Sequence, residues 1–152
     1  MYQSFIYWHS LTRWLVLAGM IYSIFRAFKG YRSAATFSKT DDKVRHWTAT
    51  IAHIQLMLGI TLYAQSPIVT YFWQHKAQAI KSMDATFFGI IHILVMLTAI
   101  VIITIGSALA KRTISDNGKF KTILIWYGIA LVLILIAIPW PFSPLAARPY
   151  FR

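Results

Sequence analysis

Four long apolar stretches, separated by short polar connections, constrain this chain more than any other feature. They cover approximately residues 5–28, 44–65, 85–110 and 120–138. A helix needs about 20 mostly apolar residues to cross the hydrocarbon core of a bilayer, and each stretch reaches that length. The sequence therefore predicts an all-α, integral membrane four-helix bundle in which residues 1–152 form a single domain.

The composition indicates that lipid is the solvent for much of the surface. Charged residues make up 12% of the chain, about half of the roughly 25% that is usual in soluble domains. The chain contains no cysteine, which excludes disulfides, iron–sulfur clusters and thiolate metal sites. The first apolar run has no basic segment before it and no small-residue cleavage site. We therefore interpret it as a permanent helix and not as a cleaved signal peptide.

The distribution of basic residues predicts the orientation of the bundle. The net charge of +11 would suggest nucleic acid in a soluble protein, but these charges lie in short connections, so we expect no nucleic-acid partner. Ten basic residues flank the first and third connections: Arg26, Lys29, Arg32, Lys39, Lys43, Arg45, Lys111, Arg112, Lys119 and Lys121. The opposite side has four: Lys76, Lys81, Arg148 and Arg152. The positive-inside rule then places both termini outside a bacterial inner membrane that the chain crosses several times.

Ionisable residues inside the apolar runs are the candidates for function, because such residues are costly in a membrane. With a helical rise of about 1.5 Å per residue, His9 and His92 lie roughly 10 and 9 Å outside the centres of their runs. His53 lies near the midplane, and His46 lies at the cytoplasmic boundary. The acidic residues are expected in connections or at helix ends, which argues against a carboxylate proton relay or a cation transporter.

The level shared by His9 and His92 predicts a haem site. Two imidazoles at one depth on facing helices of a bundle suit the ligation of haem iron. Gly89 lies about one turn before His92 and would leave space for a porphyrin face. Arg13 lies on the same helix face as His9, and an anionic group such as a haem propionate would neutralise it. We therefore predict one haem b, with His9 and His92 as its iron ligands.

Other interpretations of these residues remain open. Each histidine could simply bond a neighbouring hydroxyl or carbonyl group, and Arg13 could extend outward to water or phosphate. His53 could line a quinone site with Gln55 or Thr50, or it could be the true partner of His92 if the third helix is shifted. Two haems on His46 and His53 would be only about 10 Å apart along the helix, which favours a single haem.

Several segments of the chain resemble a known family. They are His9-Ser-Leu-Thr-Arg13-Trp14-Leu, Arg45-His46-Trp47-Thr-Ala-Thr-Ile-Ala-His53-Ile-Gln, Phe88-Gly-Ile-Ile-His92 and Ile138-Pro-Trp-Pro-Phe-Ser-Pro-Leu-Ala. They resemble small four-helix bacterial membrane proteins, typical of Bacteroidota, that are labelled "cytochrome B". The resemblance covers nearly the whole chain and implies a b-type haem and a respiratory membrane. A looser similarity links the chain to bacterial superoxide oxidases and hydrogenase cytochrome subunits. Those proteins generally carry two haems, whereas the last apolar run here contains no histidine.

Three functions follow as hypotheses. The leading one is a membrane-bound b-type cytochrome that transfers electrons between menaquinone and a partner at the outer face. It leaves open whether the chain is itself a quinone-linked oxidoreductase component. The alternative is a non-redox accessory subunit of a larger inner-membrane complex, such as a respiratory one. A small-molecule or metal transporter is the third, and the lack of acidic residues and cysteines in the apolar runs disfavours it.

Overall fold

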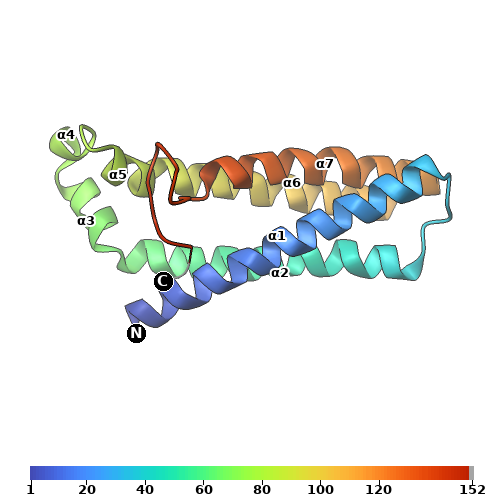
Figure 1. The fold of residues 1–152 in the computed structure, drawn as a ribbon, viewed down its shortest axis with the longest axis horizontal. Coiled ribbons are helices and arrows are strands. Elements are labelled where there is room, and N and C mark those ends of the chain that lie inside the picture. The colour runs from blue at the N-terminus through green and yellow to red at the C-terminus, as the bar shows by residue number, and fades with distance from the viewer. Residues whose placement is uncertain (151–152) are drawn as a thin grey trace.

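Four long helices pack along one another in the computed structural model, which describes residues 1–150 (Figure 1). They are α1 (Tyr2–Arg32), α2 (Lys39–Gln65), α6 (His92–Arg112) and α7 (Asp116–Ala137). Helix α1 contacts α2 and α7, and α6 contacts α7 and α2, so the four helices surround one core. These 150 residues contain no strand, which confirms the all-α fold class.

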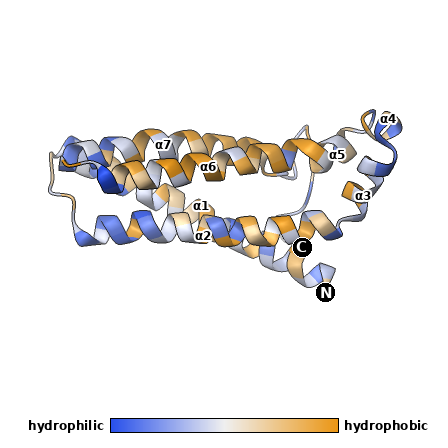
Figure 2. Cartoon of the chain, turned by 180° about the vertical axis from the view of Figure 1, so that it is seen from behind, coloured by the Kyte–Doolittle hydropathy of each residue, from blue (hydrophilic) through white to orange (hydrophobic). Residues whose placement is uncertain are grey.

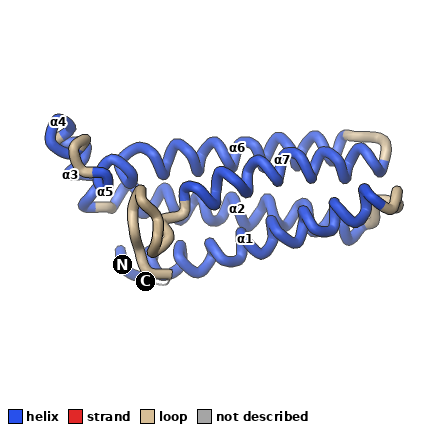
Figure 3. Tube along the Cα trace, turned by 45° about the horizontal axis from the view of Figure 1, so that its top comes forward, coloured by secondary structure: helices blue, strands red, loops and turns tan. Residues whose placement is uncertain are grey.

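The two ends of the bundle differ in structure. The connections 33–38 and 113–115 lie at one end, which we call the loop end (Figures 1 and 3). The other end, which we call the tail end, holds the N-terminus and the C-terminal tail, residues 139–150. It also holds three short helices: α3 (Pro67–Gln74), α4 (Lys76–Ala79) and α5 (Met83–Thr86). Because the chain makes an even number of long helices, both of its ends come to the same side of the bundle.

Helix α1 begins at Tyr2 instead of 5, without a side-chain cap, and α2 and α7 also begin earlier than the apolar pattern suggests, because polar residues cap them. Helix α2 begins at Lys39 instead of 44, since Ser38 and Asp41 form a capping box. The Asp41 amide donates to Ser38 Oγ at 3.2 Å, and the Ser38 amide donates to the Asp41 carboxylate at 2.9 Å. Helix α7 begins at Asp116 instead of 120, since Ser115 Oγ accepts a hydrogen bond from the Gly118 amide at 3.2 Å. The acidic residues expected in these connections are therefore in first helical turns.

Three helical segments are long and apolar enough to cross a membrane: Tyr2–Arg32, Met83–Arg112 and Asp116–Ala137. Figure 2 shows hydrophobic residues along the length of α6 and α7 and hydrophilic residues at the start of α2 and around α4. The fourth expected span, in α2, is long enough but is the least apolar of the four. Length and composition thus support three spans, and the position of α2 in a membrane stays a prediction.

The polar residues of α2 are turned toward its neighbours in the bundle. Thr48 Oγ1 lies 2.8 Å from the Ser23 hydroxyl of α1, and Gln55 donates to the carbonyl of His9 at 2.9 Å. The outward positions near the middle of α2 are large and apolar: Trp47, Ile54, Met57 and Ile60. The low apolar character of α2 therefore has two sources: the exposed polar residues of its first turns and the inward polar residues that bond α1.

The segment Met83–Arg112 contains a π-helical turn, η1 (Phe87–Ile91), immediately before α6. A π turn holds one residue more than an α-helical turn and often occurs at functional sites. The expected helix at 85–110 is therefore continuous but changes its helical register just before His92. Apolar periodicity alone does not reveal such a change, because every residue of η1 except one glycine is a bulky hydrophobe.

Candidate functional site

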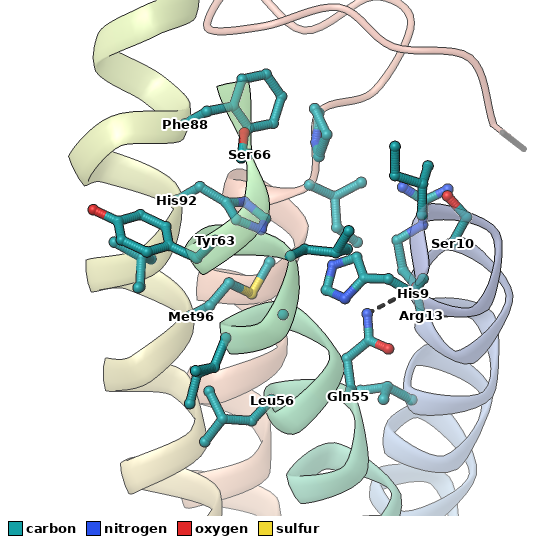
Figure 4. Close-up of a pocket in the computed structure, with 18 of the residues that line it drawn as sticks. His9, Ser10, Arg13, Gln55, Leu56, Tyr63, Ser66, Phe88, His92 and Met96 are labelled. Atoms are coloured by element: carbon teal, nitrogen blue, oxygen red, sulfur yellow. Dashed lines mark hydrogen bonds between the residues drawn. The ribbon is translucent and has the colours of Figure 1, made fainter. Parts of the chain in front are cut away.

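A cavity of about 190 Å³ lies between the helices near the tail end of the bundle (Figure 4). All four long helices contribute to its wall, together with residues next to α3 and in the C-terminal tail. Aliphatic side chains form much of the wall. The polar residues that line it are Tyr2, His9, Ser10, Arg13, Gln55, Tyr63, Ser66, His92 and Arg148. An apolar cavity with a few convergent polar groups is the usual form of a cofactor or ligand site.

The imidazoles of His9 and His92 meet at this cavity. Figure 4 shows His9 reaching in from α1 and His92 from α6. Their ring centroids are 6.4 Å apart, and the ring planes form an angle of 68°. The structure thus brings together the two histidines that helical rise alone places at one depth.

His92 is held in one orientation by its surroundings. Its Nδ1 lies 2.8 Å from the carbonyl oxygen of Ala137, at the end of α7. Since a carbonyl can only accept, Nδ1 carries a proton, and in the neutral ring the lone pair is then on Nε2. The rings of Phe87 and Phe88 lie 5.5 and 6.2 Å from the imidazole and restrict its movement. His92 is therefore oriented as a neutral imidazole whose second nitrogen is available to a ligand.

His9 has a different environment. Its Nδ1 is buried and has no hydrogen-bond partner among residues 1–150. Gln55 bonds the backbone carbonyl of His9, not the ring, and Gln55 also accepts a bond from the hydroxyl of Thr12. Gly59 of α2 makes room for the ring, because a Cβ added there would lie 3.3 Å from His9 Cε1. Gly59 is not among the residues predicted for the site, although a lone glycine inside an apolar run is a signal of close approach.

Gly89 lies outside the cavity wall. A Cβ added at Gly89 would lie 2.4 Å from Cγ of Phe72, so the ring of Phe72 takes the space that was expected for a porphyrin face. The carbonyl of Gly89 accepts a hydrogen bond from the Tyr63 hydroxyl at 2.7 Å, and Trp73 Nε1 donates to that hydroxyl at 2.8 Å. The missing side chain of Gly89 thus serves the packing of α3 against the π turn.

The other histidines do not reach the cavity. His53 Nε2 lies 3.0 Å from Thr104 Oγ1, and Thr104 is twelve residues beyond His92, about 18 Å along the helix. His53 therefore does not share a site with His92, and neither Thr50 nor His53 lines the cavity beside Gln55. His46 and His75 are exposed, at the loop end and next to α3 respectively.

Two arginines, Arg13 and Arg148, line the cavity. The C-terminal tail, which carries Arg148, folds back over this end of the bundle (Figures 1 and 3). The guanidinium of Arg13 donates to the carbonyl of Tyr150, and its Nε is buried without a hydrogen-bond partner in the part of the chain that the structure describes. Arg148 forms an ion pair of 2.6 Å with Asp84 and lies 4.8 Å over the Phe88 ring. Arg13 is predicted from the sequence as a site residue, whereas Arg148 is not, because 64 residues separate Arg148 from its partner Asp84.

The donor atoms of this cavity fit haem iron. A metal–imidazole bond is about 2 Å long, so imidazoles whose ring centroids are 6.4 Å apart are close enough for both to reach one metal ion. Within residues 1–150 no group of three or more His, Cys, Asp or Glu side chains is placed to hold a metal ion. Two histidine ligands suffice when a porphyrin supplies the remaining ones.

The cavity is narrow for a whole porphyrin. Its volume of about 190 Å³ exceeds that of an engineered cavity that binds benzene, about 150 Å³, but is below the roughly 300 to 1,000 Å³ of most ligand pockets. A porphyrin would therefore require flexible wall residues such as Leu56 and Met96 to adopt other rotamers.

Comparisons of the chain with protein-family models, with curated proteins and with solved structures give no match. The resemblance to the small membrane proteins labelled "cytochrome B" accordingly stays a prediction.

Proposed function

We propose that this chain is a b-type cytochrome of the bacterial inner membrane that holds one haem between His9 and His92. The observation that carries the proposal is the meeting of two imidazoles, 6.4 Å apart, at an apolar cavity lined by all four long helices. In this proposal the protein transfers electrons between menaquinone in the bilayer and a partner at the outer face. Haem supplies the one-electron chemistry when it is bound.

The residues around the cavity have separate roles in this proposal. The bond from His92 Nδ1 to the Ala137 carbonyl fixes the ring and increases the basicity of Nε2, which favours metal ligation. Gly59 lets the ring of His9 lie against α2. Arg13 brings a positive charge to the cavity and so stabilises an added electron there, which raises the reduction potential of the site. The aliphatic wall excludes water.

A spectrum of the purified protein tests the proposal directly. We expect a Soret band and a reduced-minus-oxidised difference spectrum of the b type, both lost in His9→Ala and His92→Ala. His53→Ala is the matched control, because that histidine also lies on a long helix of the bundle but bonds Thr104 and does not line the cavity. A Soret band that survives His92→Ala, or that His53→Ala removes, would show that the ligands are wrong.

A purified wild-type chain that folds and lacks haem in stoichiometric amounts would favour the alternative, a non-redox accessory subunit. In that case the close approach of His9 and His92 is a packing contact inside the bundle. Co-purification with a larger inner-membrane complex would then be expected.

We also propose that α2 crosses the membrane with the other three long helices, with the loop end in the cytoplasm and both termini outside. The inward polar residues of α2 and the concentration of basic residues at the loop end support this topology. The chain has no cysteine, so a single introduced cysteine is the only thiol that a maleimide can label. In intact spheroplasts a membrane-impermeant maleimide should label Lys81→Cys and not Lys111→Cys. The opposite pattern would reverse the orientation.

A further inference from the structure

The cavity has a cationic edge that the two iron ligands leave unexplained. Arg13 of α1 and Arg148 of the C-terminal tail both line it, and the tail connects them, since Arg13 also bonds the carbonyl of Tyr150. These are guanidinium groups from opposite ends of the chain, and both meet the C-terminal tail at the wall of one cavity. Their placement depends on the tail folding back across the bundle (Figure 1).

The positive charge at this edge is only partly compensated. Asp84 pairs with Arg148, and the side chains of both retain some exposure. Arg13 has no acidic partner within residues 1–150, and its Nε is buried without any hydrogen-bond partner there. A guanidinium next to an apolar cavity is a strong binding group for a carboxylate, because charge-assisted hydrogen bonds gain strength away from water. The edge therefore suits a ligand with an apolar body and carboxylates on one side.

We infer that Arg13 and Arg148 bind the two carboxylates of the tetrapyrrole, and that the C-terminal tail is thereby a part of the binding site. This inference rests on the proposed haem function and adds to it the orientation of the ligand, with its carboxylate edge toward the tail. Asp84 positions Arg148 through their ion pair, and the five N–H donors of a guanidinium leave some free for a ligand carboxylate.

The carboxylates themselves provide the first test. Haem-free protein in detergent is titrated with haem b and, separately, with haem b dimethyl ester, and the Soret band is followed. The ester keeps the iron and the ring but loses both negative charges. We expect the wild-type protein to bind the diacid about a hundredfold more tightly than the diester, about tenfold for each arginine.

Variants identify the groups that make this distinction. Arg148→Gln and Arg13→Gln should each reduce the preference for the diacid about tenfold, and the double variant should bind both porphyrins equally. Arg148→Lys should restore part of the preference, because it restores the charge without the planar geometry. Lys81→Gln is the matched control, since Lys81 is an exposed cation near the tail end that does not line the cavity.

The outcomes separate this inference from the proposed function. Equal binding of diacid and diester by the wild-type protein, each with a full Soret band, overturns the role of the arginines and leaves the haem site intact. No Soret band with either porphyrin overturns both proposals. If micelles containing phosphatidylglycerol abolish the preference and neutral lipid restores it, lipid phosphate competes for the same two arginines, which supports their role as the anion-binding groups. The wild-type titrations decide the matter even if a variant fails to fold.

Discussion

The two ends of this bundle differ in the hydrogen bonding of their buried polar groups. At the loop end, the buried guanidinium of Arg45 donates to Asp42 at 2.7 Å and to the Ser107 carbonyl at 3.1 Å. The hydroxyl of Tyr127 in turn donates to the Arg45 carbonyl at 2.9 Å. At the tail end, Nδ1 of His9 and Nε of Arg13 are buried without hydrogen-bond partners among residues 1–150.

Packing follows the same division. The loop end is close-packed around glycines: a Cβ at Gly30 would lie 2.3 Å from Phe120 Cζ, and a Cβ at Gly106 would lie 2.3 Å from Trp126 Cβ. The cavity recorded near the loop end, beside Asp41, measures about 10 Å³, against about 190 Å³ at the tail end. Close packing with paired polar groups stabilises the fold at the loop end. At the tail end, the cavity and the unpaired polar groups leave interactions that a ligand can complete. We therefore expect substitutions at the two ends to change the free energy of unfolding by different amounts and in opposite directions.

The largest effect is expected from Arg45→Met. This change removes the bonds to Asp42 and Ser107 and leaves the buried Ser107 hydroxyl without a charged partner. We expect a loss of about 3 kcal/mol in the free energy of unfolding, measured by titration with SDS in mixed micelles. A loss below about 0.5 kcal/mol, the size of an ordinary surface change, would contradict the view that this end stabilises the bundle.

Gly106→Ala should have the next largest effect. Its new Cβ would collide with Cβ of Trp126, which cannot move without the backbone of α7, so we expect a loss of about 2 kcal/mol. Gly128→Ala is the matched control, because nothing lies within 4 Å of the added methyl group. That control should gain about 0.5 to 1 kcal/mol from helix propensity. Equal effects at the two glycines in the same assay would rule out close packing as the cause.

His9→Leu should have the opposite sign from these loop-end changes. In the haem-free protein it removes a buried nitrogen that has no partner, so we expect a gain of about 1 kcal/mol in the free energy of unfolding. The same variant should lose the Soret band when haem is supplied. A haem-free protein that His9→Leu destabilises by more than about 1 kcal/mol would mean that this end is built for stability after all.

The smallest change in stability is expected from Gly59→Ala. The added methyl group would lie 3.3 Å from His9 Cε1, a contact that a small rotation of the ring relieves. We expect the free energy of unfolding to change by less than about 0.5 kcal/mol, while haem affinity falls because the ring has moved. Spectral titration beside the SDS assay separates the two quantities, and unchanged affinity would remove Gly59 from the site.

The sequence predicts the helices well and the site only in part. Apolar length predicts four helices, and the fixed rise of a helix predicts the common level of His9 and His92. The ends of α2 and α7 are missed, because their caps lie outside the apolar runs. The direction in which a side chain points is harder to predict than its depth along the helix. Whether an imidazole points into the bundle depends on the rotation of its helix, and no apolar periodicity shows the register change in η1.

The contacts of the C-terminal tail could not be predicted at all. Its prolines suggest an extended segment, and an ion pair between Arg148 and Asp84 leaves no local pattern in the sequence. The same holds for Gly89, whose partner Phe72 lies in a separate helix. Local patterns predict elements, whereas the wall of a cavity is made by contacts between distant segments.

The π turn before His92 also sets the direction of α3 to α5 relative to α6. The one extra residue rotates the segment of α3 to α5 about the axis of α6 by about 100°, compared with its position on an unbroken α-helix. Deleting a single residue from Phe87–Ile91 would cancel that offset. Either the segment of α3 to α5 or His92 would then point in another direction, while the packing of α7 against α1 and α6 would not change. The direction of α3 to α5 can thus differ without any change in the register of the 21 residues of α6.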